Sequence, residues 1–180
     1  VPAGTYGLTL PAAATDGEDN GDLNLTTPAA GNPTIAIVGA GAGVTVIDAN
    51  QIDRVLNVHA SRTAVVSDLS MRNGFAGATR SGGAISNSGT LRLARVSIDA
   101  NSARVGGGAF NFGTGNLNMQ GCIVSNNTAV TYGGGIYNVG GGSLTLLDSN
   151  VSSNAAGMLG GVGGGIDNEG TMLMNRSTVA

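Results

Sequence analysis

A glycine cluster that recurs along the chain is the feature that most constrains its fold. Each cluster precedes a short segment in which apolar and polar residues alternate, as they do in a strand with one buried face. The four clusters begin at Gly82, Gly107, Gly133 and Gly163. Equivalent residues of the segments that follow them lie 26, 27 and 28 residues apart, at Leu91, Leu117, Leu144 and Met172. Such a period predicts a solenoid, in which each repeat buries its apolar face against its neighbours.

Each repeat contains three segments that predict short strands. In the first segment Leu91 and Leu93 face inward, while Arg92 faces solvent. A corner follows, after which Val96 and Ile98 form the next inward pair, and the glycine-rich segment turns the chain toward the next repeat. The 32 glycines oppose helix formation, each by about 1 kcal/mol relative to alanine. The pattern therefore predicts an all-β parallel β-helix with three short strands per rung and roughly six rungs.

An asparagine closes each regular repeat at the corner after the second strand. The three residues are Asn101, Asn127 and Asn154, and Gly74 takes the equivalent place one repeat earlier. Amide side chains stacked in register hydrogen-bond to one another and to backbone groups of the corner. We therefore expect these asparagines to form a buried structural ladder.

The chain is expected to form a single β-helix domain over residues 1–180, with a regular and an irregular part. Residues 63–180 form the regular part, with repeats of about 25–30 residues. Residues 1–62 predict irregular N-terminal rungs, one of them built from strands at 35–37, 44–46 and 55–58. Residues 15–22 hold four of the eleven acidic residues and predict a loop between strands at 6–10 and 22–26.

Composition narrows the classes of partner. The chain has no lysine and a net charge of −3, which argues against a nucleic acid or an anionic membrane surface as partner. No segment has the roughly 18 consecutive apolar residues of a membrane-spanning helix. The single cysteine, Cys122, falls in an inward column beside Val96 and Ser149. This position indicates a small buried hydrophobic residue rather than a nucleophile or metal ligand.

Several motifs carry a resemblance to a known family. They are the run 1–10, the run 34–48, and repeats of the form Gly-Gly-Gly-Ile-Tyr-Asn with a following Ser-Asn-Val-Ser-Ser-Asn. In these motifs the chain resembles secreted bacterial right-handed β-helix proteins of the CSLREA-domain kind. Its Gly-Gly-Ala-Ile and Gly-Gly-Ala-Phe segments are similar to repeats of polymorphic outer membrane proteins and other autotransporter passengers. The resemblance implies a right-handed, pectate-lyase-like coil that is secreted or held at the cell surface, and it implies no activity.

An enzyme remains the alternative, because pectate lyases and polygalacturonases use the same coil. Hydrolysis requires two carboxylates about 5 to 9.5 Å apart across a sugar. We place Asp68 and Asp148 at different corner positions and Asp99 after the second strand, so that these three acids share no column. Asp167 and Glu169 are close in sequence, but no aligned acid lies one rung below them. No catalytic residue is therefore predicted.

The only histidine offers a second candidate for chemistry. Arg54, Arg62 and Arg72 lie near His59 in sequence, and a base flanked by guanidinium groups could bind a uronate. No acid is placed to orient the ring, so we interpret His59 as a strand-end residue in a solvated corner.

The acidic loop contains half of a calcium motif. Asp16, Glu18, Asn20 and Asp22 place oxygen atoms at alternate positions around Gly21, as at the opening of a Ca²⁺ loop. Thr27 stands where that motif requires a bidentate glutamate. The loop is therefore either a weak calcium site or an ordinary solvated turn, and no other cofactor is predicted.

The remaining expectations concern partners and function. A carbohydrate partner would need exposed aromatic side chains, for which only Phe112, Tyr132 and Tyr137 are plausible. Each end of the coil would leave inward residues and strand edges uncovered, which predicts either a homo-oligomer or filament formed through the ends, or neighbouring repeats of a longer chain. We expect a non-catalytic structural or adhesive module of a secreted or cell-surface bacterial protein. A polysaccharide-active lyase or glycoside hydrolase is the alternative.

Overall fold

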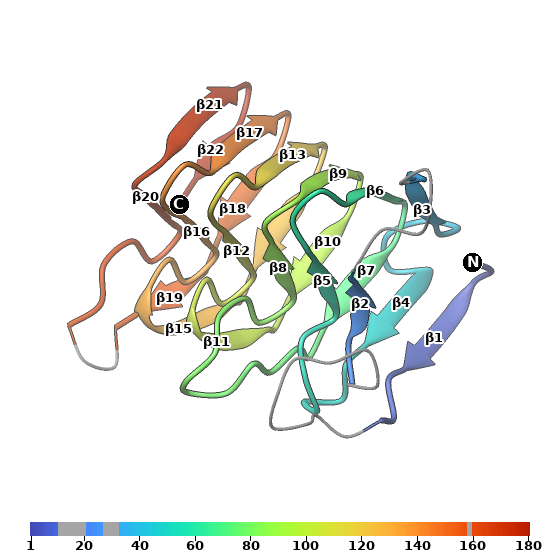
Figure 1. Cartoon of the computed structure of the whole chain (residues 1–180). Coiled ribbons are helices and arrows are strands. Elements are labelled where there is room, and N and C mark those ends of the chain that lie inside the picture. The colour runs from blue at the N-terminus through green and yellow to red at the C-terminus, as the bar shows by residue number, and fades with distance from the viewer. Residues whose placement is uncertain (11–20, 27–32, 158–159) are drawn as a thin grey trace.

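The computed structural model describes residues 1–10, 21–26, 33–157 and 160–180, and every regular element in these ranges is a β-strand. The strands pair in parallel and stack into four sheets that wind along one coil (Figure 1). The prediction of an all-β, right-handed parallel β-helix is confirmed. We number the sheets in the order in which the chain visits them within one turn.

Sheet 1 contains β3 (Ile35–Val38), β6 (Thr63–Ser67), β9 (Thr90–Ala94), β13 (Asn116–Gln120), β17 (Ser143–Leu147) and β21 (Thr171–Asn175). Sheet 2 contains β1 (Gly4–Gly7), β4 (Thr45–Asp48), β7 (Ser70–Arg72), β10 (Ser97–Asp99), β14 (Ile123–Ser125), β18 (Asn150–Ser152) and β22 (Thr178–Val179). Sheet 3 contains β11 (Ser102–Val105), β15 (Thr128–Tyr132) and β19 (Ala155–Ala156). Sheet 4 contains β2 (Leu23–Leu25), β5 (Leu56–Val58), β8 (Ile85–Asn87), β12 (Ala109–Asn111), β16 (Ile136–Asn138) and β20 (Ile166–Asn168).

The described strands make five complete turns, from β3 to β20, with β1 and β2 before them and β21 and β22 after them. The first two complete turns have the three predicted strands, and the next three have a fourth, in sheet 3. The turn that contains β7 replaces this strand by two isolated bridges, Phe75↔Ser102 and Ser81↔Val105. The extra residues between these two bridges have no counterpart in β11, so they leave the ladder there.

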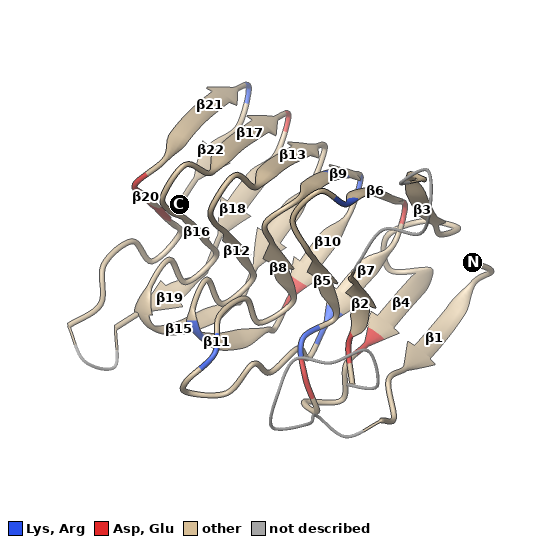
Figure 2. Ribbon diagram, in the orientation of Figure 1, with Lys and Arg blue, Asp and Glu red and all other residues tan. Residues whose placement is uncertain are grey.

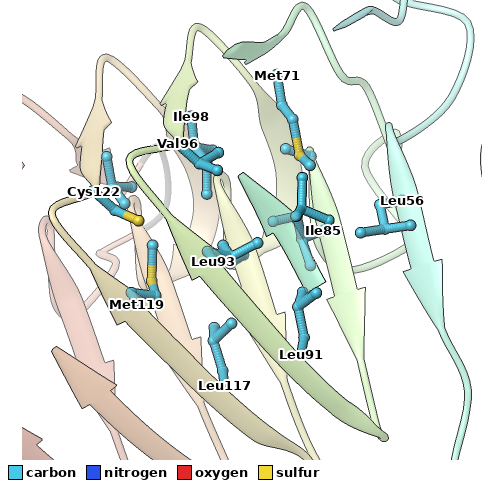
Figure 3. Close-up of a cluster of buried hydrophobic side chains, with 14 of the residues drawn as sticks. Leu56, Met71, Ile85, Leu91, Leu93, Val96, Ile98, Leu117, Met119 and Cys122 are labelled. Atoms are coloured by element: carbon cyan, nitrogen blue, oxygen red, sulfur yellow. The ribbon is translucent and has the colours of Figure 1, made fainter. Parts of the chain in front are cut away.

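The interior consists of apolar columns in register. Leu91 pairs with Leu117 and Leu117 with Leu144, while Ile98 pairs with Val124 and Val124 with Val151. All of these side chains are buried, and Figure 3 shows Leu91 beside Leu117 and Val96 beside Cys122 between the sheets. Each rung therefore adds apolar surface to the same continuous core, as the period of the sequence predicts.

The recurring glycines have two distinct structural reasons. Gly106 and Gly133 have positive φ values of 60° and 57°, a region that glycine enters without steric cost. The next residue, Gly107, lies so close to the carbonyl of Gly134 in the following turn that a Cβ atom would collide with it. The first glycine turns the chain, and the second allows consecutive rungs to approach.

The N-terminal strands differ in detail from the prediction. β1 pairs with β4 only from Gly4 to Gly7, and the backbone N–H of Leu8 makes the next hydrogen bond, 2.8 Å to the carbonyl of Asp48. Leu8 packs against the core, but Leu10 is exposed, so the predicted strand at 6–10 begins and ends too late. The strands expected at 35–37, 44–46 and 55–58 are present as β3, β4 and β5.

Candidate functional site

The three predicted ladder asparagines lie one above another at the edge of sheet 2. Asn101 donates an amide hydrogen bond of 2.9 Å to Oδ1 of Asn127, and Asn127 donates one of 2.9 Å to Oδ1 of Asn154. Each Oδ1 also accepts the backbone N–H one rung below, ending with Gly74 at 2.7 Å. The structure thus brings these residues together around the corner backbone, and buries the first two almost completely.

A second asparagine ladder, missed in the sequence, follows the end of sheet 4. Its amides bond from Asn87 to Asn111, from Asn111 to Asn138 and from Asn138 to Asn168, each at 2.7 Å. Val58 occupies the rung before Asn87, so the carbonyl oxygen of Asn87 ends the ladder without an amide below it. The signal was the asparagine that ends the Ile-Tyr-Asn motif, which recurs at the same place in each repeat.

Two of the candidate catalytic acids form ion pairs at the corner after sheet 1. Asp68 accepts bonds of 2.6 and 2.8 Å from Arg95, and Asp148 accepts one of 2.9 Å from Nη2 of Arg176. These hydrogen bonds lower the pKa of both carboxyls. The prediction that Asp68 and Asp148 occupy different corner positions is wrong, since sheet 1 runs in register and places both in one column, separated by Arg95 and Gly121.

Asp99 is also part of the structural network. Its Oδ1 accepts hydrogen bonds from the Ser125 hydroxyl, at 3.0 Å, and from the Asn126 amide, at 2.7 Å. Both donors lie one turn further along the coil. This carboxylate therefore links neighbouring rungs in the manner of Asp68 and Asp148.

Charge gathers at the N-terminal end of the coil. Figure 2 shows acidic and basic residues around β2, β4 and β5. The carboxylate of Asp48 accepts a hydrogen bond of 2.8 Å from Arg72 and one of 3.0 Å from Asn73. Burial alone would raise the pKa of Asp48, but these bonds and the backbone N–H of Asn50 together lower it. The corner after β4 thus depends on an ionised carboxylate.

A second buried charged group includes part of the suspected calcium loop. Asp53 lies 3.3 Å from Nη2 of Arg80, and Asp22 lies 3.6 Å from Nε of Arg54. Asp16, Glu18 and Asn20 lie outside the described residues. Asp22 faces a guanidinium, which repels a cation, so this carboxylate does not support the calcium interpretation. In the described ranges no group of three acidic, histidine or cysteine side chains is arranged to hold a metal ion.

The surroundings of His59 and Cys122 indicate that both side chains have structural roles. Nε2 of His59 lies 3.1 Å from the amide nitrogen of Asn57, which acts as donor when that ring nitrogen carries no proton. The thiol of Cys122 is buried, and burial raises its pKa, which keeps it protonated. Cys122 thus occupies the inward column that the sequence predicts.

Four of the six aromatic residues gather on the outer side of sheet 4 and at the adjoining end of sheet 3, a group that we call the aromatic strip. Phe110 stacks on Phe112 with ring centroids 4.9 Å apart, and Tyr132 stacks on Tyr137 at 5.7 Å. Phe110 and Tyr137 join the two pairs at 5.7 Å, since they are register partners in β12 and β16. Three of these residues were named from the sequence as separate candidates, and the winding of the coil makes them one surface.

The aromatic strip has an acidic end. The hydroxyl of Tyr137 donates a hydrogen bond of 2.9 Å to Oε1 of Glu169, and Asp167 is the register partner of Tyr137 in β20. Burial, together with the hydrogen bond to Glu169 and its charge, raises the pKa of Tyr137 to about 12. Burial and the charge of Glu169 also raise the pKa of Asp167. The surroundings at this end of the strip therefore favour the protonated forms of Tyr137 and Asp167.

A hollow of about 210 Å³ lies at the opposite end of the aromatic strip. It is lined by Arg54, Arg80, Ser81, Ser86, Phe110 and Phe112. Ser86 is the register partner of Phe110 in the preceding turn. In this outward column the small side chain of Ser86 is therefore followed by the rings of Phe110 and Tyr137 in the next two turns.

The chain was also compared with known proteins. No family model, no curated protein and no solved structure matches it. Across the residues that the structure describes, no helix is long and apolar enough to span a membrane.

Proposed function

We propose that this chain is a non-catalytic β-helix module that serves as a structural or adhesive part of a secreted or cell-surface bacterial protein. The observation that carries the proposal is the use of the outward carboxylates. Asp48, Asp68 and Asp148 each hold an arginine one rung away, and Asp99 holds two polar side chains of the next rung. Acids committed to rung-to-rung bonds stiffen a rod and leave little for acid–base chemistry.

The adhesive part of the proposal is supported by the aromatic strip. Aromatic residues make up 3% of the chain, and four of them form this one surface. Tyr132 is 40% exposed although it lies in a paired strand. An aromatic strip that is partly exposed in this way can serve as a contact surface.

The last rung supports self-association as one form of the structural role. Met172 and Val179 are 39% and 43% exposed, whereas their register partners Leu144 and Val151 are fully buried. A further rung would cover these residues and pair the free edges of β20, β21 and β22. The proposal places either a second copy of the chain or neighbouring repeats of a longer chain there.

The test combines activity with association. Purified protein is incubated with neutral and uronate-containing polysaccharides, and unsaturated products and new reducing ends are measured. We expect neither product, and light scattering should show concentration-dependent association that Val179→Asp weakens. Cleavage of any polysaccharide would overturn the non-catalytic function, and a strictly monomeric protein would overturn self-association.

One observation favours the enzyme as a second candidate. Asp167 and Glu169 adjoin the aromatic strip, and the raised pKa of Asp167 is a property of general acids. An enzyme of this design would lose its activity in Asp167→Asn while remaining folded. If cleavage is found and this variant retains it, the acids at this end of the strip are not the catalytic ones.

A further inference from the structure

We infer that the hollow beside Ser86 binds one pyranose ring of a glycan, with Phe110 and Phe112 as its apolar wall. The inference rests on the adhesive part of the proposed function and names the ligand of that surface. It is carried by three observations: the register of sheet 4, the polar groups around the hollow, and its size.

The register explains why the hollow exists. Asn57, Ser86, Phe110 and Tyr137 occupy one outward column in successive turns. Phe110 and Tyr137 fill their rungs with rings, whereas Ser86 contributes only a hydroxymethyl group. Consecutive strands lie about 4.8 Å apart, so a rung without a large side chain leaves room for roughly one ring beside Phe110.

The lining matches the two kinds of surface that a sugar ring presents. A pyranose has a face of C–H groups, which packs on aromatic rings, and a rim of hydroxyl oxygens, which needs donors and acceptors. Phe110 and Phe112 stack at 4.9 Å and supply a rigid apolar wall. Ser81, Ser86 and the guanidinium of Arg80 supply hydrogen-bonding groups at the same hollow.

The charges favour a ligand rich in oxygen acceptors. The side chain of Arg80 is 28% exposed, while that of its partner Asp53 is fully buried. Arg54, which also lines the hollow, is 3% exposed and lies 3.6 Å from the buried Asp22. A ligand therefore meets the guanidinium of Arg80 rather than a carboxylate, and sugar hydroxyl or carboxylate oxygens accept hydrogen bonds from such a group.

The size limits the ligand to a single ring at this position. Pockets for drug-sized ligands usually have volumes of about 300 to 1,000 Å³, whereas this open hollow has a volume of about 210 Å³. The rest of a glycan would extend along the aromatic strip toward Tyr137 and Tyr132, which continue the same face of the coil. Binding is therefore expected to strengthen from a monosaccharide to an oligosaccharide.

The experiment measures the affinity of the protein for glycans and compares three variants with the parent. A glycan array with neutral and uronate-containing oligosaccharides first identifies the sugar, and isothermal titration calorimetry then gives its affinity. We expect Phe112→Ala to weaken binding about tenfold, the value of one aromatic contact of about 1.4 kcal/mol. Phe75→Ala is the matched control, because Phe75 is 45% exposed but does not line the hollow, and its affinity should equal that of the parent.

A second variant fills the hollow instead of removing its wall. Ser86→Phe continues the aromatic column into the empty rung and should abolish binding, while circular dichroism verifies the fold. An array without any bound glycan, or unchanged affinity in folded Ser86→Phe, would overturn the inference. These results differ from polysaccharide cleavage, which would overturn the proposed non-catalytic function and leave a sugar site in place.

Discussion

The edge of sheet 2 is held in two different ways at the two ends of the coil. From the turn of β10 onward, Asn101, Asn127 and Asn154 stack their amides and bind the corner backbone. At β4, the same edge is held by the carboxylate of Asp48, which accepts from Arg72 of the next turn. The regular part has a neutral device that repeats, beside the single carboxylate of Asp99, whereas the N-terminal part relies on the ion pair of Asp48 and Arg72.

The difference follows from hydrogen-bonding capacity. An amide donates and accepts, so each asparagine can serve the rung above and the rung below without any change of charge. An ionised carboxylate only accepts, and two carboxylates in adjacent rungs would repel each other. The column of Asp48 accordingly continues with Arg72, its register partner in β7. Amide ladders can be extended with every repeat, whereas a charged corner needs a specific partner and depends on pH.

The largest expected effect comes from a charge placed in the regular core. Val124→Asp should destabilise the coil by about 4 kcal/mol or more, because Val124 is buried between the apolar side chains of Ile98 and Val151, where a carboxylate would lose its hydration. Ile123→Asp is the matched control, since Ile123 is the adjacent residue and is 49% exposed. Thermal unfolding measures both variants. Equal melting temperatures would contradict the assignment of the inward column.

The next effect tests the amide ladder itself. Asn127→Ala should cost about 1 to 3 kcal/mol, because it removes the acceptor of the buried backbone N–H of Asn101 and a donor to the carbonyl of Ile98. Asn150→Ala, an exposed asparagine in β18, should change stability little. Urea unfolding of the two variants gives the difference. A loss in Asn127→Ala no larger than in the control would mean that the ladder accompanies the fold without stabilising it.

The sequence predicts the regular part of the fold well, for a physical reason. Each inward column requires an apolar side chain at every turn. The register of Leu91, Leu117 and Leu144 can therefore be predicted from their spacing alone. The corner after sheet 1 lacks such repetition, since Asp68, Arg95 and Gly121 share a column and have different side chains. That is why the position of Asp148 relative to Asp68 was predicted wrongly.

The candidate site is less accessible to sequence reasoning. Tyr132 belongs to β15 and Tyr137 to β16, and their contact depends on the tight glycine turn between them. The hollow exists because Ser86 precedes Phe110 in its column, a relation that only the register between turns makes visible. A contact between side chains of different rungs leaves no pattern in the sequence of either rung, so only the three-dimensional structure reveals it.

A smaller effect, confined to one end of the coil, is expected on acidification. The folded state holds the pKa of Asp48 below its unfolded value, so this carboxylate stabilises the fold above that value and the contribution is lost as pH falls through the acid range below about 3.9. Hydrogen exchange at neutral pH and at about pH 3 should show β1 and β4 losing protection before β14 and β18. Asp48→Asn should reduce this selective loss. Uniform loss of protection along the coil would contradict a difference between its two ends.

The smallest effect is expected from the exposed ion pairs, which resemble the Asp48 corner in composition and differ from it in burial. Arg95→Ala removes the partner of Asp68, and the side chain of Arg95 is 67% exposed, so water already screens the attraction. We expect a melting temperature within experimental error of the parent, while carboxyl NMR shows the pKa of Asp68 rising toward its ordinary value as the hydrogen bond from Arg95 is lost. Arg72→Ala, measured alongside, should lower stability more, because it leaves the buried Asp48 with one donor fewer. If Arg95→Ala lowered stability as much as Asn127→Ala, exposed ion pairs would stabilise the corners as much as amide ladders do. Burial would then not explain the difference between the two ends of the coil.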